Sequence, residues 1–115
     1  MSTPTEFVRV CRVSDVPDPG KTVVEVDDRL VAIFHVGGEF FALDDLCTHD
    51  GGPLAEGELD GHTIRCPRHG ALFDLRSGAA LSMPATRPTP AHEVRVEGGE
   101  VLVRLNSGKW MVDSG

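Results

Sequence analysis

The sequence predicts an all-β protein, an antiparallel β-sandwich or small barrel, and three observations support this prediction. No segment sustains the roughly 3.6-residue apolar period of an amphipathic helix. Most of the chain consists of short runs in which apolar and polar residues alternate, as in half-buried strands. Glycine pairs separate several of these runs, and two-residue glycine turns favour hairpins. A length of 115 residues leaves room for one domain with a modest core.

The first half of the chain contains the clearest strand patterns. Alternating or continuous apolar runs predict strands at residues 7–13, 23–26, 29–36 and 39–43. Residues 15–20, which include Pro17 and Pro19, predict a turn-rich break after the first strand. Gly37-Gly38 stands between the third and fourth runs and predicts a hairpin, because glycine adopts positive φ at little cost.

The second half has shorter patterns that glycine and proline interrupt. Short strands are expected around Leu59, at 62–65, in a hairpin of 71–75 with 79–81, and in a last hairpin of 93–96 with 100–105. Met83 to Pro90 contains three prolines and predicts an ordered loop outside the strands. Residues 106–115 are expected to form a polar tail.

Charge and hydropathy exclude several classes of partner. The formal net charge of −7 argues against nucleic acid and against anionic membranes. No apolar run approaches the roughly 18 residues that span a bilayer. The segment from Met1 to Glu6 has no basic region, twin arginine or apolar signal, so a cytoplasmic protein is expected.

Two short motifs each combine a cysteine and a histidine. Cys47-Thr48-His49 is followed, sixteen residues later, by Cys66-Pro67-Arg68-His69. Two thiolates with two imidazoles suit zinc or an iron–sulfur cluster. A Cys2His2 zinc finger draws its cysteines from one arm and its histidines from the other, whereas each arm here is mixed. Two crossing arms would give two cysteines to one iron and two histidines to the other, the arrangement of a Rieske [2Fe–2S] centre.

The motifs and their flanks resemble the two cluster-binding loops of Rieske-type ferredoxins, the small electron carriers of bacterial ring-hydroxylating dioxygenase systems. The resemblance runs from about Phe7 to Leu105 and rests on the segments CTHDGGPL (47–54) and CPRHGALFDL (66–75). It implies a Rieske fold in a single domain, 1–115, with an inserted cluster-binding subdomain at about 46–75. The cluster ligands, both metal-binding and cofactor-binding, would be Cys47, His49, Cys66 and His69.

The function that the resemblance implies is electron transfer. The protein would carry single electrons from a flavin-dependent ferredoxin reductase to a terminal oxygenase of aromatic hydrocarbon catabolism. It would have no catalytic residues, would not be an enzyme by itself, and would diffuse as a monomer. In relatives of this type, the segment corresponding to Met83 to Pro90 covers one side of the cluster.

Two alternatives remain at this point. Small Rieske subunits of assimilatory nitrite reductases share the fold but often lack the ligands, so the intact quartet favours the ferredoxin. A zinc-stabilised binding module without a redox role would be colourless.

The reduction potential is expected to be low. High-potential relatives place a serine and a tyrosine just after the second loop, where their hydroxyls donate to cluster sulfurs. The corresponding positions here are Ala71 and Phe73, and the chain contains no tyrosine. We therefore expect a midpoint near the lower end of the Rieske window, about −150 mV, that changes little with pH around neutrality.

Gly51 and Arg68 occupy the positions of the extra, disulfide-forming cysteines of membrane-anchored Rieske subunits.

Other reactive residues have simpler interpretations. Cys11 is expected to be a small buried strand residue, because no cysteine is left to pair with it. His35, His62 and His92 are expected to be surface or packed residues instead of ligands. Arg65 and Arg68 either orient an acidic partner or solvate the rim of the site, and Asp50 is similarly ambiguous.

Overall fold

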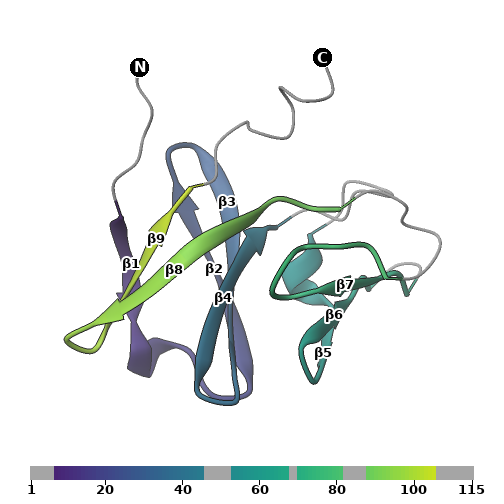
Figure 1. Cartoon of the computed structure of the whole chain (residues 1–115), viewed down its shortest axis with the longest axis horizontal. Helices are drawn as coiled ribbons and strands as arrows, with labels where there is room; N and C mark the ends of the chain where they lie inside the picture. Colours follow the sequence, from purple (N-terminus) through teal and green to yellow (C-terminus); the bar gives the residue numbers. More distant parts are fainter. Residues whose placement is uncertain (1–6, 46–52, 68–69, 82–87, 106–115) are drawn as a thin grey trace.

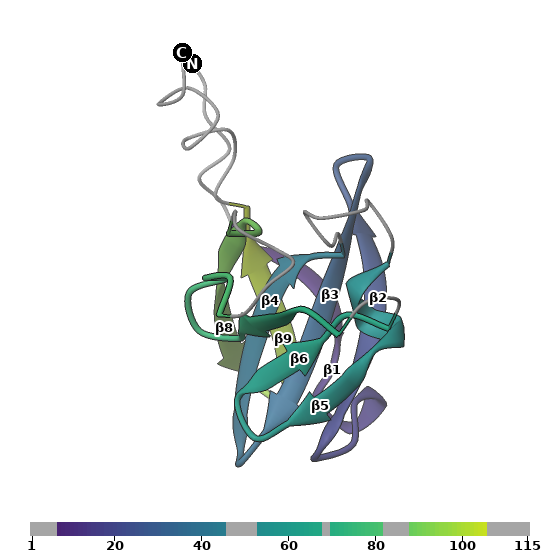
Figure 2. The ribbon, with the colours of Figure 1, turned by 90° about the vertical axis from the view of Figure 1, so that its right-hand side faces the viewer.

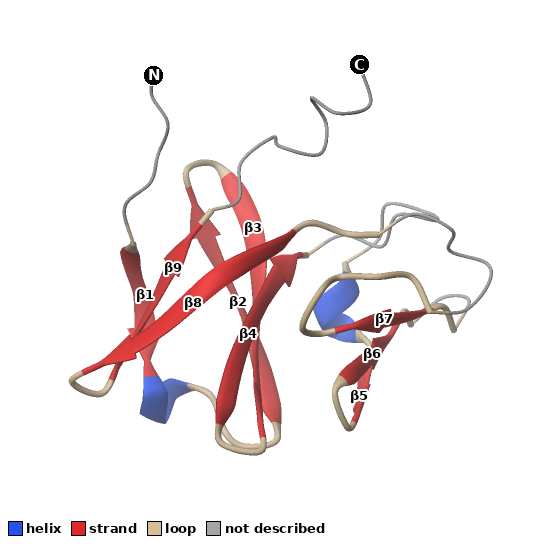
Figure 3. Cartoon of the chain, in the orientation of Figure 1, coloured by secondary structure: helices blue, strands red, loops and turns tan. Residues whose placement is uncertain are grey.

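The computed structural model describes residues 7–45, 53–67, 70–81 and 88–105, and these segments confirm the all-β prediction (Figure 1). Strands account for almost all of the regular structure, as the colouring in Figure 3 shows. The described strands are β1 (Val8–Arg12), β2 (Gly20–Val26), β3 (Arg29–Val36), β4 (Glu39–Asp44), β5 (Glu58–Asp60), β6 (Thr63–Arg65), β7 (Leu72–Asp74), β8 (Ala91–Glu97) and β9 (Glu100–Arg104). Two single-turn 3-10 helices are η1 (Val13–Asp15) and η2 (Leu54–Glu56).

The strands form two antiparallel sheets. The larger has the order β1-β9-β8-β4-β3-β2, and its edge strands β1 and β2 pack against each other, so the sheet curls into a near-barrel. The smaller has the order β5-β6-β7 and is inserted in the chain between β4 and β8. Figure 2 shows this small sheet lying over β3 and β4.

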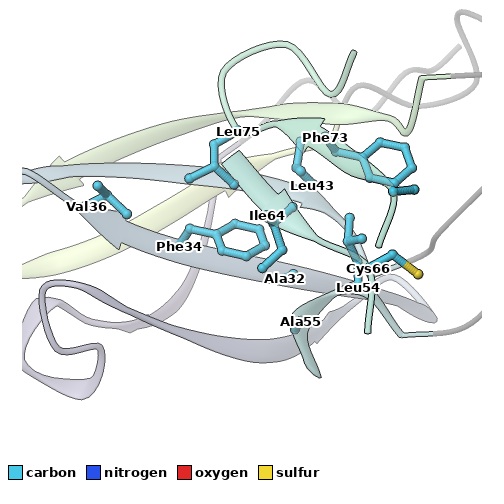
Figure 4. Close-up of a cluster of buried hydrophobic side chains, with 11 residues drawn as sticks. Ala32, Phe34, Val36, Leu43, Leu54, Ala55, Ile64, Cys66, Phe73 and Leu75 are labelled. Atoms are coloured by element: carbon cyan, nitrogen blue, oxygen red, sulfur yellow. The ribbon is translucent and has the colours of Figure 1, made fainter. Parts of the chain in front are cut away.

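The two faces of β3 and β4 serve two different cores, because successive side chains of a strand point to opposite faces. Ala32 and Leu43 are cross-strand partners on the face toward the small sheet, whereas Ile33 and Ala42 are partners on the face toward the barrel interior. The barrel core consists of Val16, Val26, Val31, Ile33, Ala42, Val101, Val103 and Leu105. The interface core consists of Ala32, Phe34, Val36, Leu43, Leu54, Ala55, Ile64, Cys66, Ala71, Phe73 and Leu75 (Figure 4).

The interface core joins the small sheet to the barrel. Phe34 and Leu43 from the barrel, and Ile64 and Phe73 from the small sheet, are fully buried in it. Burying each such side chain stabilises the fold by about 1.5–3 kcal/mol. The small sheet therefore sits on a rigid platform, and this platform positions both loops that carry the predicted ligands.

Local predictions and structure agree best at the hairpins. Gly37 and Gly38 have φ of 61° and 82° and connect β3 to β4 as predicted. The arm expected at 79–81 pairs with β7 through a single bridge, between Phe73 and Ala80. The helix η2 was not expected from the pattern, because one turn of three residues leaves no periodic signal.

Several predicted features lie outside the described residues. These are most of the proline-containing loop and the tail at 106–115. Among the described residues, no helix is long and apolar enough to cross a membrane.

Candidate metal centre

The residues that flank the two predicted ligand loops meet in the interface core. Leu54 and Ala55, which follow the first loop, are buried together with Cys66 and Ala71, which bound the second. Figure 4 shows Leu54 beside Cys66 at one end of this core. Two motifs that are far apart in the sequence are thus rooted at the same place, as a shared metal centre requires.

Cys66 is the predicted ligand that the structure describes. It directly follows β6 and is 1% exposed. Its N–H donates to the Ala71 carbonyl at 2.7 Å, and its own carbonyl accepts from the Gly70 N–H at 3.0 Å. Figure 4 shows its sulfur pointing away from the apolar side chains of the core. Cys47, His49 and His69 lie outside the described residues, so the complete ligand set stays a prediction.

A tight turn holds Cys66 in place. Gly70 has φ of +77°, a left-handed conformation that L side chains rarely adopt, and it closes the turn onto Cys66. Pro67, on the other side of the cysteine, is exposed.

The base of the first loop is closed by a residue that the sequence did not single out. The Asp45 carboxylate accepts a hydrogen bond of 2.7 Å from the Ala55 N–H, across the segment that contains Cys47 and His49. The Asp45 N–H donates to the Leu30 carbonyl at 3.0 Å, which ties the same point to β3. The only signal in the sequence was an aspartate at the start of a segment rich in glycine and proline, and aspartates in such loops commonly bond to nearby backbone N–H groups.

Close backbone packing joins η2 to β6. A Cβ atom at Gly57 would overlap the backbone carbonyl oxygen of Arg65, so glycine alone fits between the end of η2 and the residue before Cys66. This contact fixes the distance between the bases of the two loops.

The side chains around Cys66 are consistent with an electron-rich cluster. Ala71 and Phe73 are both 0% exposed, and neither side chain carries a hydrogen-bond donor. A buried soft thiol in apolar surroundings fits the cysteine-bound iron of a Rieske centre. The low midpoint potential itself stays a prediction.

An open hollow of about 360 Å³ lies beside the cysteine. Its lining is charged at the rim and consists of Glu56, Gly57, Glu58, Arg65, Cys66, Pro67 and Gly70. The guanidinium of Arg65 is exposed there, 3.7 Å from where a Cβ of Gly70 would lie. Arg65 is thus next to the second loop as expected, while Arg68 and Asp50 lie outside the described residues.

The three remaining histidines are packed residues, as predicted. His35 Nδ1 donates a 2.8 Å hydrogen bond to the Val16 carbonyl, because a carbonyl oxygen can only accept. His62 packs edge-on against Phe41, with its Nε2 3.8 Å from Glu39 Oε1. The His92 side chain is completely buried and bonds to Asp44.

Cys11 lies on β1 and is partly buried beside the barrel core. Burial, and secondarily the negative charge of Asp15, raises the pKa of its thiol. Cys11 is therefore protonated at neutral pH and is a strand residue as predicted, although it is only partly buried.

The fold and the bases of the two loops define the class of protein. The chain belongs to the Rieske [2Fe-2S] domain family, whose match spans residues 6–93. The resident cofactor of this family is a Rieske-type [2Fe–2S] cluster.

Two relatives of this chain are ferredoxins of dioxygenase systems. The chain is 41% identical to the 3-phenylpropionate/cinnamic acid dioxygenase ferredoxin subunit of Escherichia coli strain K12, over 85% of this chain and 92% of that subunit. The ferredoxin of carbazole 1,9a-dioxygenase from Nocardioides aromaticivorans IC177 superimposes with a TM-score of 0.84 at 31% identity, over 87% of this chain and 98% of that one. Within its family, the chain groups with the ferredoxin subunits of aromatic ring-hydroxylating dioxygenases.

A third relative has been solved with its partner. In a complex of reduced oxygenase and oxidised ferredoxin of carbazole 1,9a-dioxygenase, a chain 39% identical to this one superimposes with a TM-score of 0.81, over 87% of this chain and 94% of that one.

Proposed function

We propose that this protein is the electron-carrying ferredoxin of an aromatic ring-hydroxylating dioxygenase system. It takes single electrons from a flavoprotein reductase and passes them to the terminal oxygenase. The observation that carries the proposal is its 41% identity to a dioxygenase ferredoxin subunit over 92% of that subunit's length. This likeness favours the carrier over the nitrite reductase subunit that the sequence left as an alternative.

The four predicted ligands would hold the cluster. Cys47 and Cys66 would bind one iron, and His49 and His69 the other. The cluster, when bound, supplies reversible one-electron chemistry. The chain contributes the surroundings: the interface core excludes water from the side of Cys66, and the turn from Cys66 to Ala71 fixes the direction of the thiol.

The proposed partners follow from the same relatives. The carbazole dioxygenase ferredoxin forms a complex with its oxygenase, and we propose an equivalent complex for this chain. Single electrons would be exchanged on the side of the cluster that His49 and His69 would hold, because Cys66, the described ligand of the other iron, is 1% exposed. A flavoprotein reductase as donor, a cytoplasmic location and a monomeric state stay predictions from the sequence.

An anaerobic reductive titration followed by mixing with a partner tests the proposal. The purified protein should take up one electron per chain, and the reduced form should be reoxidised by the oxidised terminal oxygenase of its own system. The variant Cys66→Ala should bind no cluster and transfer no electrons. A colourless wild-type protein with stoichiometric zinc would contradict the proposal.

A further inference from the structure

A buried charge network lies at the point where the first ligand loop leaves the barrel. Asp44, the last residue of β4, accepts a 2.8 Å hydrogen bond from Arg29 Nη2 at one carboxylate oxygen. Its other oxygen lies 2.8 Å from His92 Nε2. The side chains of Arg29, Asp44 and His92 are 29%, 14% and 0% exposed. Because these side chains are hydrogen-bonded to one another and poorly solvated, their interaction is stronger than that of an exposed surface ion pair.

The geometry of the sheet explains how these three side chains meet. In the strand order, β4 lies between β3 and β8. Val31 pairs with Asp44 and Ala42 pairs with His92, so Arg29 and His92 each lie two residues from a cross-strand position on the same face as Asp44. Diagonal neighbours of this kind are within reach of long side chains.

Backbone hydrogen bonds converge on the same point. The Asp44 N–H donates to the Pro90 carbonyl at 2.9 Å, and the Asp45 N–H donates to the Leu30 carbonyl at 3.0 Å. The base of the first loop is therefore tied to the start of β3 and to the segment that precedes β8. That segment returns from the proline-containing loop at residues 83–90, which is expected to cover the cluster.

The position of Asp44 brings its charge close to the proposed cluster. Asp44 precedes Cys47 by three residues, and three residues of extended chain span at most about 11 Å. Charges that are largely buried interact over such distances with little screening by salt. The potential of an iron–sulfur cluster depends on the surrounding charge and on the orientation of its ligands.

We propose that Asp44, Arg29 and His92 form a positioning network that holds the base of the first ligand loop and sets the reduction potential of the cluster. This inference rests on the proposed function, because it takes Cys47 as a ligand. The ionised carboxylate disfavours the extra electron of the reduced cluster, and its two bonds keep the loop base in one orientation. Within the network, the Asp44 carboxylate lowers the potential, and the positive charge of Arg29 offsets part of that effect.

The variant Asp44→Asn tests the proposal in the cluster-loaded protein. It keeps the side-chain shape but removes the negative charge, so the midpoint potential should rise relative to the wild-type protein. The matched control is Asp18→Asn. Asp18 lies beside the Gly37-Gly38 turn, which precedes β4, whereas Asp44 is the last residue of that strand. Asp18 accepts bonds from the Gly37 and Gly38 N–H groups and lies 3.6 Å from His35, so this variant also loses a carboxylate near a histidine.

The control should lower folding stability but leave the midpoint potential and the electron paramagnetic resonance spectrum unchanged. A second pair, His92→Gln and His92→Phe, separates the hydrogen bond from the ring. The glutamine retains a donor and should behave as the wild-type protein, whereas the phenylalanine should broaden the resonance and release the cluster several-fold faster.

The possible outcomes are distinguishable. If the wild-type protein lacks a Rieske signal, the proposed function fails. If the wild-type signal is present and Asp44→Asn has the same potential as Asp18→Asn, the network does not set the potential. Should Asp44→Asn fail to fold, the histidine pair decides, because equal spectra and cluster-release rates for glutamine and phenylalanine would overturn the proposal.

Discussion

At the residue scale, the character of the site depends on which side chains carry hydrogen-bond donors. Cys66 lies at one end of the interface core, and Ala71 and Phe73 offer no hydroxyl where related high-potential centres have two. The chemical identity of these residues could be read directly from the sequence. Their complete burial could not, because it depends on packing between two sheets.

Restoring the hydroxyls tests this view of the potential. The double variant Ala71→Ser/Phe73→Tyr should raise the midpoint potential, because donors near the sulfurs stabilise the reduced state. A redox titration monitored by absorbance measures the shift. Phe41→Tyr adds the same hydroxyl on β4 at a half-buried position against His62 and should leave the potential unchanged. An unshifted double variant that retains its cluster would refute the proposed dependence on these donors.

The Asp44 carboxylate should also make folding stability depend on pH. Burial alone would raise its pKa, but the hydrogen bonds and charges of His92 and Arg29 outweigh burial and lower it. A depressed pKa in the folded state stabilises the protein above the unfolded value of about 3.9, and this contribution is lost as pH falls through the folded pKa.

Urea unfolding of the wild-type protein and Asp44→Asn at several pH values measures this contribution. The difference between their free energies of unfolding should be constant from neutrality to about pH 5 and should shrink below about pH 4. Effects of the cluster common to both proteins cancel in the difference. A gap that stays constant down to pH 3 would show that Asp44 does not titrate as described.

At the element scale, short-range patterns were predictable and long-range partners were not. The hairpin at Gly37-Gly38 follows from local glycine chemistry, and its strands were predicted to within one residue, at the end of β4. The closure of the first loop by Asp45 joins residues ten positions apart, and the His92–Asp44 bond joins residues 48 positions apart. No periodicity in the sequence encodes such pairs, so they emerge only from the folded sheets.

Gly57 lies between the two ligand loops, where η2 packs closely against the backbone of Arg65. Gly57→Ala places a methyl group against the Arg65 carbonyl, and forced overlap of this kind costs about 1–3 kcal/mol or more of folding stability. Because the strain falls next to Cys66, the variant should also lose its cluster more readily. Thermal unfolding and cluster absorbance measure both effects.

Gly61, in the turn between β5 and β6, provides the control. It has φ of +62° and open space where a Cβ would lie. Gly61→Asn should cost less than about 1 kcal/mol, since asparagine tolerates the left-handed region. Equal destabilisation by the two variants would show that the contact with Arg65 is unimportant.

At the scale of the whole molecule, the sequence predicted the class of fold but not its closure. Alternation indicates which side chains share a face, but not which strands become neighbours. The order β1-β9-β8-β4-β3-β2 pairs the first and last described strands, and the near-barrel closes where the edge strands β1 and β2 pack together. The sequence alone had left a sandwich and a small barrel as equal possibilities.

The two hydrophobic cores lie on opposite faces of β3 and β4 and stabilise different parts of the molecule. The barrel core stabilises β3 and β4 from one face, and the interface core mounts the small sheet on the other. As a result, the base of the first ligand loop is held by strands that are packed on both faces, and the base of the second loop is held by the small sheet that is mounted on them. A rigid mounting of this kind suits an electron carrier, whose metal centre should change little between oxidation states.

The most direct test of the central claim is the electron paramagnetic resonance spectrum of the dithionite-reduced protein, recorded for the wild type and for His69→Cys. A Rieske centre with two histidine ligands gives a rhombic signal with an average g value below that of all-cysteine clusters, and it should appear at low potential. Exchange of one histidine for cysteine should abolish that signal or move it toward the all-cysteine type. A wild-type spectrum already of the all-cysteine type, or a silent and colourless sample, would contradict the assignment of Cys47, His49, Cys66 and His69.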